Sequence, residues 1–148
     1  AARGVALGGT TGKPIDFTPI PMYDEHETAN QNNVAGCAAH LTHSINIPDA
    51  YDATGFDFSG TQRFDAKSGY RSKSFLTIPL VNNEHRVIGV LQLLNAQDPT
   101  TGELVEFQAD DQRIVESLAS QAAIALSLSP ICRCRRASPV LSSWLPHL

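Results

Sequence analysis

The chain is poor in cysteine, in basic residues and in long apolar runs. Three cysteines among 148 residues are too few for a disulfide framework, so the sequence predicts a reducing, cytoplasmic compartment. Eleven Lys and Arg residues against fifteen Asp and Glu residues argue against nucleic acid or an anionic membrane as the main partner. No apolar run approaches the roughly 18 residues that a membrane span requires. What remains is one small globular domain.

The composition that is present supports a folded core and marks one boundary. Hydrophobic residues make up 42% of the chain and charged residues 18%, which is typical of a globular domain. The last twenty residues differ, with three arginines, no acidic residue, three of the nine prolines and the only tryptophan. We therefore predict a domain over residues 1–128 and a separate tail or linker over residues 129–148.

The clearest local pattern covers residues 72–95. Two alternating apolar segments, 74–81 and 87–94, flank the turn-forming sequence Asn-Asn-Glu-His at 82–85. This pattern predicts an antiparallel hairpin. Both of its faces are largely apolar, so we expect a central position in the sheet, with helices or a pocket covering each side.

Helical spacing predicts a short helix over residues 33–42 and a long helix over residues 109–128, and a short strand is predicted at 45–47. Asp110 and Asp111 suit the first turn of the long helix, because its N-terminus carries a partial positive charge. Pro130 ends it. Its predicted buried stripe consists of Ile114, Leu118, Ala122 and Ala125 or Leu126.

Residues 49–70 hold five of the nine Phe and Tyr residues, interleaved with three glycines. We expect short helical turns and loops here rather than a long element. Aromatic residues on irregular backbone either fill a core or line a pocket, and the sequence leaves both open. In the same way, Arg71 offers a planar fork for a carboxylate or phosphate of a ligand, or pairs with an acid of the chain. The candidate ligand-binding residues are Asp49, Phe58, Ser59, Phe64, Asp65, Tyr70, Arg71 and Ser74.

No pattern predicts catalysis or a metal site. The segment 8–13 is similar to a phosphate-binding loop, but its glycine spacing is wrong and no Ser or Thr follows the lysine. His40 and His43 share a helix without a third ligand. Cys37, on the apolar face of the short helix, is better explained as a core residue than as a nucleophile. The sequence therefore predicts that the chain is not an enzyme.

Four segments resemble the GAF domain: residues 46–51, 55–60, 69–80 and 88–95. The similarity covers about residues 4–128, and it is to the type found in bacterial cyclic-nucleotide signalling proteins such as HD-domain phosphodiesterases and adenylate cyclases. The resemblance implies an α+β fold, a six-stranded antiparallel sheet with helices on both faces and a pocket under residues 46–70. It also implies that an N-terminal helix and a first strand belong before residue 1.

The resemblance further implies a role in signalling. GAF domains are usually non-catalytic sensors that bind cyclic nucleotides, tetrapyrroles or other small molecules, dimerise through flanking helices and regulate an attached output domain. We therefore expect a sensing domain of a cytoplasmic protein, a homodimer, with a cyclic nucleotide or another small molecule as ligand. The output domain, a phosphodiesterase, cyclase or kinase, would lie outside this chain. The alternative is a structural dimerisation module without a ligand.

The subset of GAF domains that binds cyclic nucleotides carries an Asn-Lys…Phe…Asp-Glu signature. Asn95, Phe107 and Asp111 match it, whereas Ala96 and Gln112 replace the lysine and the glutamate. The missing lysine removes the charge partner that the resemblance implies for the aspartate. No cysteine lies in residues 44–131, where relatives that bind bilins carry the attachment residue.

Overall fold

The structure, a computed structural model, describes residues 21–23 and 25–128. In chain order its elements are α1 (Val34–Leu41), β1 (Ile45–Ile47), α2 (Ser59–Ser68), β2 (Phe75–Val81), β3 (Val87–Leu94), β4 (Ala96–Gln97), β5 (Leu104–Val105) and α3 (Ala109–Leu128). The short helix, the short strand, the hairpin and the long helix that the sequence predicts are all confirmed. The predicted loop at 8–13 and the predicted tail at 129–148 lie outside the described residues.

The main sheet is antiparallel, in the order β1-β2-β3. Thr77 of the central strand β2 is opposite Ile45 on one side and Gln92 on the other. Asn82 shapes the β2–β3 turn, since its side-chain oxygen accepts the backbone N–H groups of Glu84 and Arg86 at 3.0 and 2.9 Å. The hairpin thus forms from the residues that the alternation predicts.

In the part of the chain that the structure describes, the strands form one sheet of three and one of two, not the single six-stranded sheet that the resemblance implies. Asn95 separates β3 from β4 because its φ of 59° is left-handed and interrupts the extended backbone. After this break β4 pairs with β5 instead of continuing along β2.

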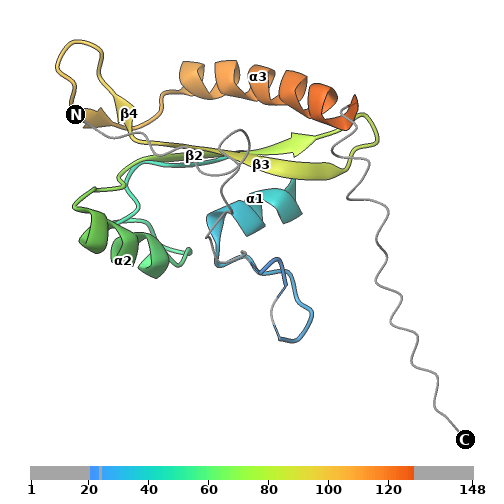
Figure 1. Cartoon of the computed structure of the whole chain (residues 1–148), viewed down its shortest axis with the longest axis horizontal. Helices are drawn as coiled ribbons and strands as arrows, with labels where there is room; N and C mark the ends of the chain where they lie inside the picture. The colour runs from blue at the N-terminus through green and yellow to red at the C-terminus, as the bar shows by residue number, and fades with distance from the viewer. Residues whose placement is uncertain (1–20, 24, 129–148) are drawn as a thin grey trace, which may run out of the picture.

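Helices cover both faces of the three-stranded sheet, with α3 on one side and α1 and α2 on the other (Figure 1). Alternate side chains of a strand point to opposite faces, so β2 enters two cores. Leu76 lies in the core beneath α3, and Phe75 lies in the core on the α1 side. The prediction of a central position covered on both sides is confirmed for β2, whereas β3 is an edge strand of the described sheet and is mostly half-buried.

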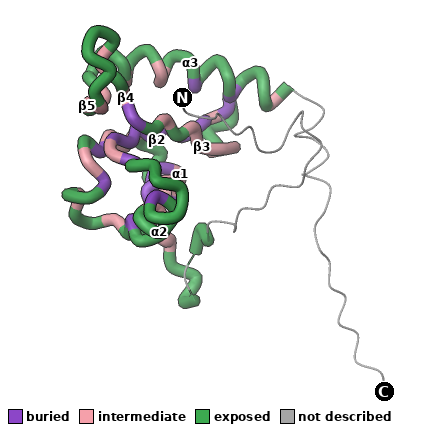
Figure 2. The backbone as a smooth tube through the Cα atoms, turned by 60° about the vertical axis from the view of Figure 1, so that its left-hand side comes forward, coloured by how far each residue is buried: buried purple, intermediate pink, exposed green. Residues whose placement is uncertain are grey.

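The predicted buried stripe of α3 is wrong. Its buried residues are Ala119 and Ala123. Two members of the predicted stripe, Ile114 and Leu118, are instead 61% and 55% exposed. The helix is exposed along most of its length (Figure 2). Apolar residues occur on two of its faces, and the smaller ones face the sheet because alanine lets the helix backbone approach closely. Spacing alone does not distinguish the two faces.

Helix α2 is the other departure from the predicted organisation. It has ten residues where short turns and loops are expected, and it ends at Gly69, whose φ of 70° is left-handed and whose N–H donates to the Asp65 carbonyl at 2.9 Å. Its sequence, SGTQRFDAKS, carries no apolar stripe. Periodicity therefore gives no signal for this helix.

The shared strand β2 should dominate stability. Leu76 is fully buried between the sheet and α3, so Leu76→Ala should lower the free energy of unfolding by about 2–5 kcal/mol through lost burial and the cavity left behind. Leu94→Ala, at a half-exposed position of the same hairpin, is the matched control and should cost much less. Urea unfolding of both variants measures the difference, and equal losses would contradict this account of the core.

Candidate ligand-binding site

A small cavity lies between the starts of α1 and α2 and the sheet. Its lining residues are Asn33, Val34, Ala35, Asp57, Phe58, Thr61, Phe75 and Gln92. The volume is about 60 Å³, enough for about two water molecules at their liquid volume. Typical ligand pockets measure about 300–1,000 Å³. Three lining residues, Asp57, Phe58 and Thr61, come from residues 46–70, under which the sequence predicts a pocket, but the volume is well below the range of ligand pockets.

The mouth of the cavity is held by the N-termini of two helices. The Asn33 side chain caps α1 by accepting the N–H groups of Ala35 and Gly36 at 2.9 and 3.2 Å. The backbone N–H of Asp57 donates to the Asn32 carbonyl at 2.7 Å, and its carboxylate accepts the N–H of Ser59 at 2.8 Å. The start of α2 is therefore tied to the loop that precedes α1.

The lining of the cavity combines aromatic and polar side chains. The rings of Phe58 and Phe75 pack with their centroids 5.3 Å apart. On the sheet, Gln92 donates from Nε2 to the Thr77 hydroxyl at 3.0 Å. Aromatic rings and an amide in one lining suit a flat, partly polar ligand.

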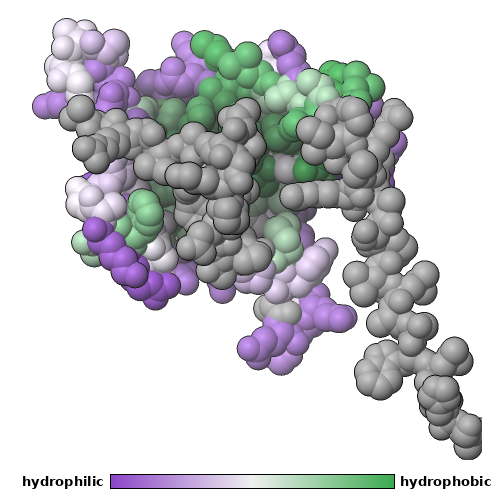
Figure 3. All heavy atoms as spheres, viewed as in Figure 1, coloured by the Kyte–Doolittle hydropathy of each residue, from purple (hydrophilic) through white to green (hydrophobic). Residues whose placement is uncertain are grey.

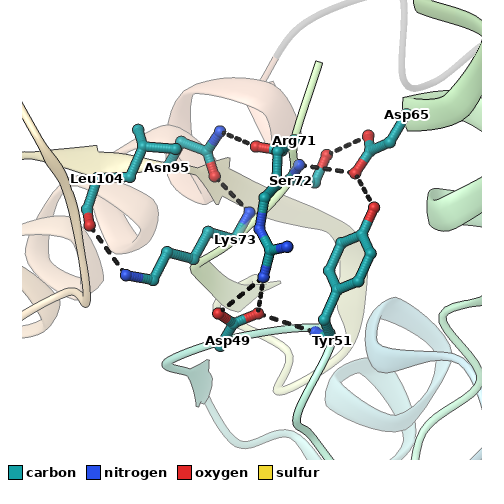
Figure 4. A network of polar contacts seen from close by, with 8 residues as sticks. All are labelled: Asp49, Tyr51, Asp65, Arg71, Ser72, Lys73, Asn95 and Leu104. Atoms are coloured by element: carbon teal, nitrogen blue, oxygen red, sulfur yellow. Dashed lines mark hydrogen bonds and ion pairs between the residues drawn. The ribbon is translucent and has the colours of Figure 1, made fainter. Parts of the chain in front are cut away.

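Beside the cavity, a polar network joins α2 to the segment that leads into β2 (Figure 4). Arg71 forms an ion pair with Asp49 at 3.2 Å, and its guanidinium carbon lies 4.2 Å from the centre of the Tyr51 ring. Of the two roles that the sequence leaves open for Arg71, the structure has the pairing with an acid. Half of the Arg71 side chain is exposed, so the ion pair by itself contributes little to stability.

Asp65 is the buried centre of this network. Its carboxylate accepts hydrogen bonds from the backbone N–H of Ser72 at 2.7 Å, the Ser72 hydroxyl at 2.8 Å and the Tyr51 hydroxyl at 2.9 Å. Partial burial raises the pKa of Tyr51, and the hydrogen bond to Asp65 raises it further. Each carboxylate oxygen thus has a donor from a segment outside α2.

Asn95 ties the same segment to the end of β3. Its side-chain oxygen accepts the N–H of Lys73 at 2.7 Å, and its amide nitrogen donates to the Arg71 carbonyl at 2.8 Å and to the Tyr70 hydroxyl at 2.7 Å. The hydroxyl of Ser74, fully buried, accepts the N–H of Ala96 at 3.1 Å. Asn95 therefore acts as a fixed anchor for residues 70–74.

The structure brings most of the predicted ligand-binding residues into one region, though not around one cavity. Phe58 lines the cavity, whereas Ser59 and Phe64 are exposed on α2. Of the remaining five, Asp49 pairs with Arg71, and Asp65 accepts hydrogen bonds from the adjacent Ser72. Tyr70 and Ser74 bond instead to residues at the end of β3, namely Asn95 and Ala96. Phe58 is the one lining residue that the sequence named, and the polar residues it missed are Asn33, Asp57, Thr61 and Gln92. Of these only Gln92 carried a signal, as the single strongly polar residue of its strand.

Of the three residues that match the cyclic-nucleotide signature, Asn95 belongs to this polar network, and the other two, Phe107 and Asp111, lie elsewhere. The Asp111 carboxylate accepts the N–H of Gln108 at 2.9 Å and so caps α3, while the Phe107 carbonyl accepts the Asn46 amide at 2.9 Å. Both residues line a groove of about 240 Å³ on the α3 side of the sheet, together with Ala96, Gln97, Ile114 and Val115. Asp111 thus has a structural partner without the lysine of the signature.

Two further features bear on the chemistry available. Over residues 21–23 and 25–128, no three His, Cys, Asp or Glu side chains converge as a metal site would require. No helix in the same described part combines the length and apolar character needed to cross a bilayer.

Residues 11–126 match the GAF domain family. The chain is 33% identical over 94 residues to "Dual 3',5'-cyclic-AMP and -GMP phosphodiesterase 11A" of Takifugu rubripes, covering 64% of this chain and 10% of that protein. It is 32% identical over 120 residues to "Dual 3',5'-cyclic-AMP and -GMP phosphodiesterase 11" of Drosophila melanogaster, covering 77% of this chain and 8% of that protein. Both relatives are animal proteins, whereas the sequence resemblance was to a bacterial type.

A solved GAF domain has the same fold. The GAF domain of a phosphoenolpyruvate-protein phosphotransferase from Coxiella burnetii superposes with a TM-score of 0.51 at 15% identity, covering 80% of this chain and 64% of that one. The α+β fold with an antiparallel sheet between helices is thereby confirmed.

The Asp57 carboxylate at the cavity should make the thermal stability of the domain depend on pH. Hydrogen bonds from Ser59 to the Asp57 carboxylate lower the pKa of Asp57. A lowered pKa in the folded state contributes stability above the unfolded pKa of about 3.9, and this contribution is lost as pH falls through the lowered value. Asp57→Ala should therefore reduce Tm at pH 7, and the difference from wild type should shrink at pH 3.

Asp52→Ala removes an exposed carboxylate of the same segment and serves as the control. Thermal unfolding at both pH values measures the effect. A difference between wild type and Asp57→Ala that is as large at pH 3 as at pH 7 would contradict the charged cap.

Proposed function

The chain belongs to the GAF domain family, and from this premise we propose that it senses a small molecule on behalf of a signalling protein. A GAF domain is a regulatory domain, and this chain matches a tenth or less of the length of the two phosphodiesterases described above. We assign the output activity, that of a phosphodiesterase, cyclase or kinase, to another part of a longer cytoplasmic protein.

The observation that carries this proposal is the cavity lined by aromatic and polar side chains. Phe58 and Phe75 supply aromatic contact, the Asn33 amide nitrogen is a donor, and the Gln92 amide oxygen is an acceptor. This combination suits the flat, polar-edged base of a nucleotide. The two relatives named above are phosphodiesterases of cyclic AMP and cyclic GMP, which supports a cyclic nucleotide as the ligand class.

A cyclic nucleotide exceeds the 60 Å³ that this structure offers, so one wall has to move when the ligand binds. β2 and β3 are fixed by their ladder, and the start of α1 is fixed by its cap. α2 supplies Thr61 and has a single buried residue. We therefore propose that ligand entry displaces α2 away from the sheet.

Binding should appear as thermal stabilisation. A ligand at a hundred times its Kd adds about 2.7 kcal/mol to the free energy of unfolding, so cyclic AMP or cyclic GMP in the millimolar range should raise Tm. Thr61→Leu fills the cavity and should abolish the response, while Thr61→Ser should keep it. Differential scanning fluorimetry followed by calorimetry provides the measurement. A wild-type Tm unmoved by either nucleotide would overturn the ligand class.

A second function, dimerisation, is favoured by the outer face of α3. Ile114, Leu118, Ala125 and Leu128 occupy positions separated by four and three residues in turn, with Gln121 completing the series. That spacing is the apolar seam of a coiled coil. Exposed apolar side chains gather over α3 in Figure 3. We propose that α3 of a second copy covers this seam, giving a homodimer.

Charge in the seam should break the dimer without unfolding the domain. Ile114 and Leu118 are more than half exposed, so Ile114→Glu with Leu118→Glu should convert a dimer to a monomer while leaving the circular dichroism spectrum unchanged. Ser120→Glu, exposed on the same helix but outside the seam, is the control. Sedimentation velocity distinguishes the species. A wild-type chain that stays monomeric at high concentration would refute this second function.

A further inference from the structure

Helix α2 is attached to the domain in an unusual way. A surface helix normally buries an apolar stripe, but Asp65, 4% exposed, is the only buried residue of α2. Its one aromatic residue, Phe64, is 57% exposed. Apolar attachment comes only from Phe58, which lies in the core immediately before the first turn. The N-terminal end of α2 is therefore held by an apolar anchor, and the C-terminal half is held by one carboxylate.

That carboxylate is bound entirely by donors from outside α2. Ser72 donates twice, through its backbone N–H and its hydroxyl, and Tyr51 donates once, over distances of 2.7–2.9 Å (Figure 4). Hydrogen bonds to an ionised group are stronger than those between neutral groups. The C-terminal half of α2 is thus attached strongly, but only through the side chain of Asp65.

The segments that supply these donors are fixed to the sheet. Lys73, next to Ser72, accepts the N–H of Ala50 on its carbonyl at 2.8 Å and donates its own N–H to Asn95 at 2.7 Å. The Tyr51 ring lies under the Arg71 guanidinium. The partners of Asp65 therefore stay in place when α2 moves.

We infer that Asp65 is a latch that holds α2 closed over the cavity, and that loss of its hydrogen bonds frees α2 to open as a lid. The role rests on the proposed function, because Thr61 makes α2 a wall of the ligand cavity. Asp65 is a positioning residue and not a ligand contact. Phe58, buried in the core at the N-terminal end of α2, is the pivot about which the released C-terminal half swings.

Hydrogen exchange on the whole chain tests the latch without reference to any ligand. Asp65→Asn keeps the size of the side chain but replaces one acceptor oxygen by a donor. Exchange of the amides of residues 59–68 should accelerate about 10- to 100-fold, while exchange in β2 and α3 stays unchanged. Tyr51→Phe removes a single hydrogen bond, so its effect on the same amides should be about fivefold. Asp52→Asn, an exposed position in the same segment, should change nothing.

Two results would overturn the latch. One is unchanged exchange in α2 for both Asp65→Asn and Tyr51→Phe. The other is equal acceleration in α2, β2 and α3, which would make Asp65 part of the global fold. Stopped-flow association with cyclic GMP adds a functional readout, in which Asp65→Asn should bind faster. If local exchange rises as expected but the wild type binds neither cyclic GMP nor cyclic AMP, the latch stands and the proposed ligand class falls.

Discussion

The pairing of β2 with β3, under cover on both faces, is the constraint on which the rest of the structure depends. All but the last residue of β2 are buried, and neighbouring side chains of this strand serve opposite cores. Phe75 lines the cavity, and the adjacent Leu76 packs in the core beneath α3. The proposed ligand site and the helix of the proposed dimer therefore lie on opposite sides of the same strand, β2.

In this arrangement a single strand, β2, separates the cavity from α3. Ala119 and Ala123 pack against the sheet with almost no exposed area, so little space remains to absorb a shift of β2. Any coupling between the cavity and α3 would therefore pass through β2, whose Phe75 and Leu76 belong to the two cores. Coupling free energies between protein sites are typically about 1–3 kcal/mol.

Elements with a periodic apolar pattern were predicted from the sequence, whereas individual side-chain pairs were not. Alternation located the hairpin, and helical spacing located α3, yet apolar residues on two faces of α3 led to the wrong buried stripe. Two acids of the aromatic-rich segment, Asp49 and Asp65, lie in one polar network with Arg71. That Asp49 pairs with Arg71, and Asp65 with Ser72, depends on the path of the backbone, which no spacing rule supplies.

The feature that hid α2 from sequence analysis is also what suits it to act as a lid. Opening an apolar lid exposes buried apolar surface to water, which costs about 25 cal/mol of free energy per Å². Opening a lid held by hydrogen bonds exchanges protein partners for water, and the net cost of each bond is only about 0.5–1.5 kcal/mol, or up to about 3 when one partner is charged. A polar helix with one buried carboxylate is therefore closed most of the time and still opens without unfolding the sheet beneath it.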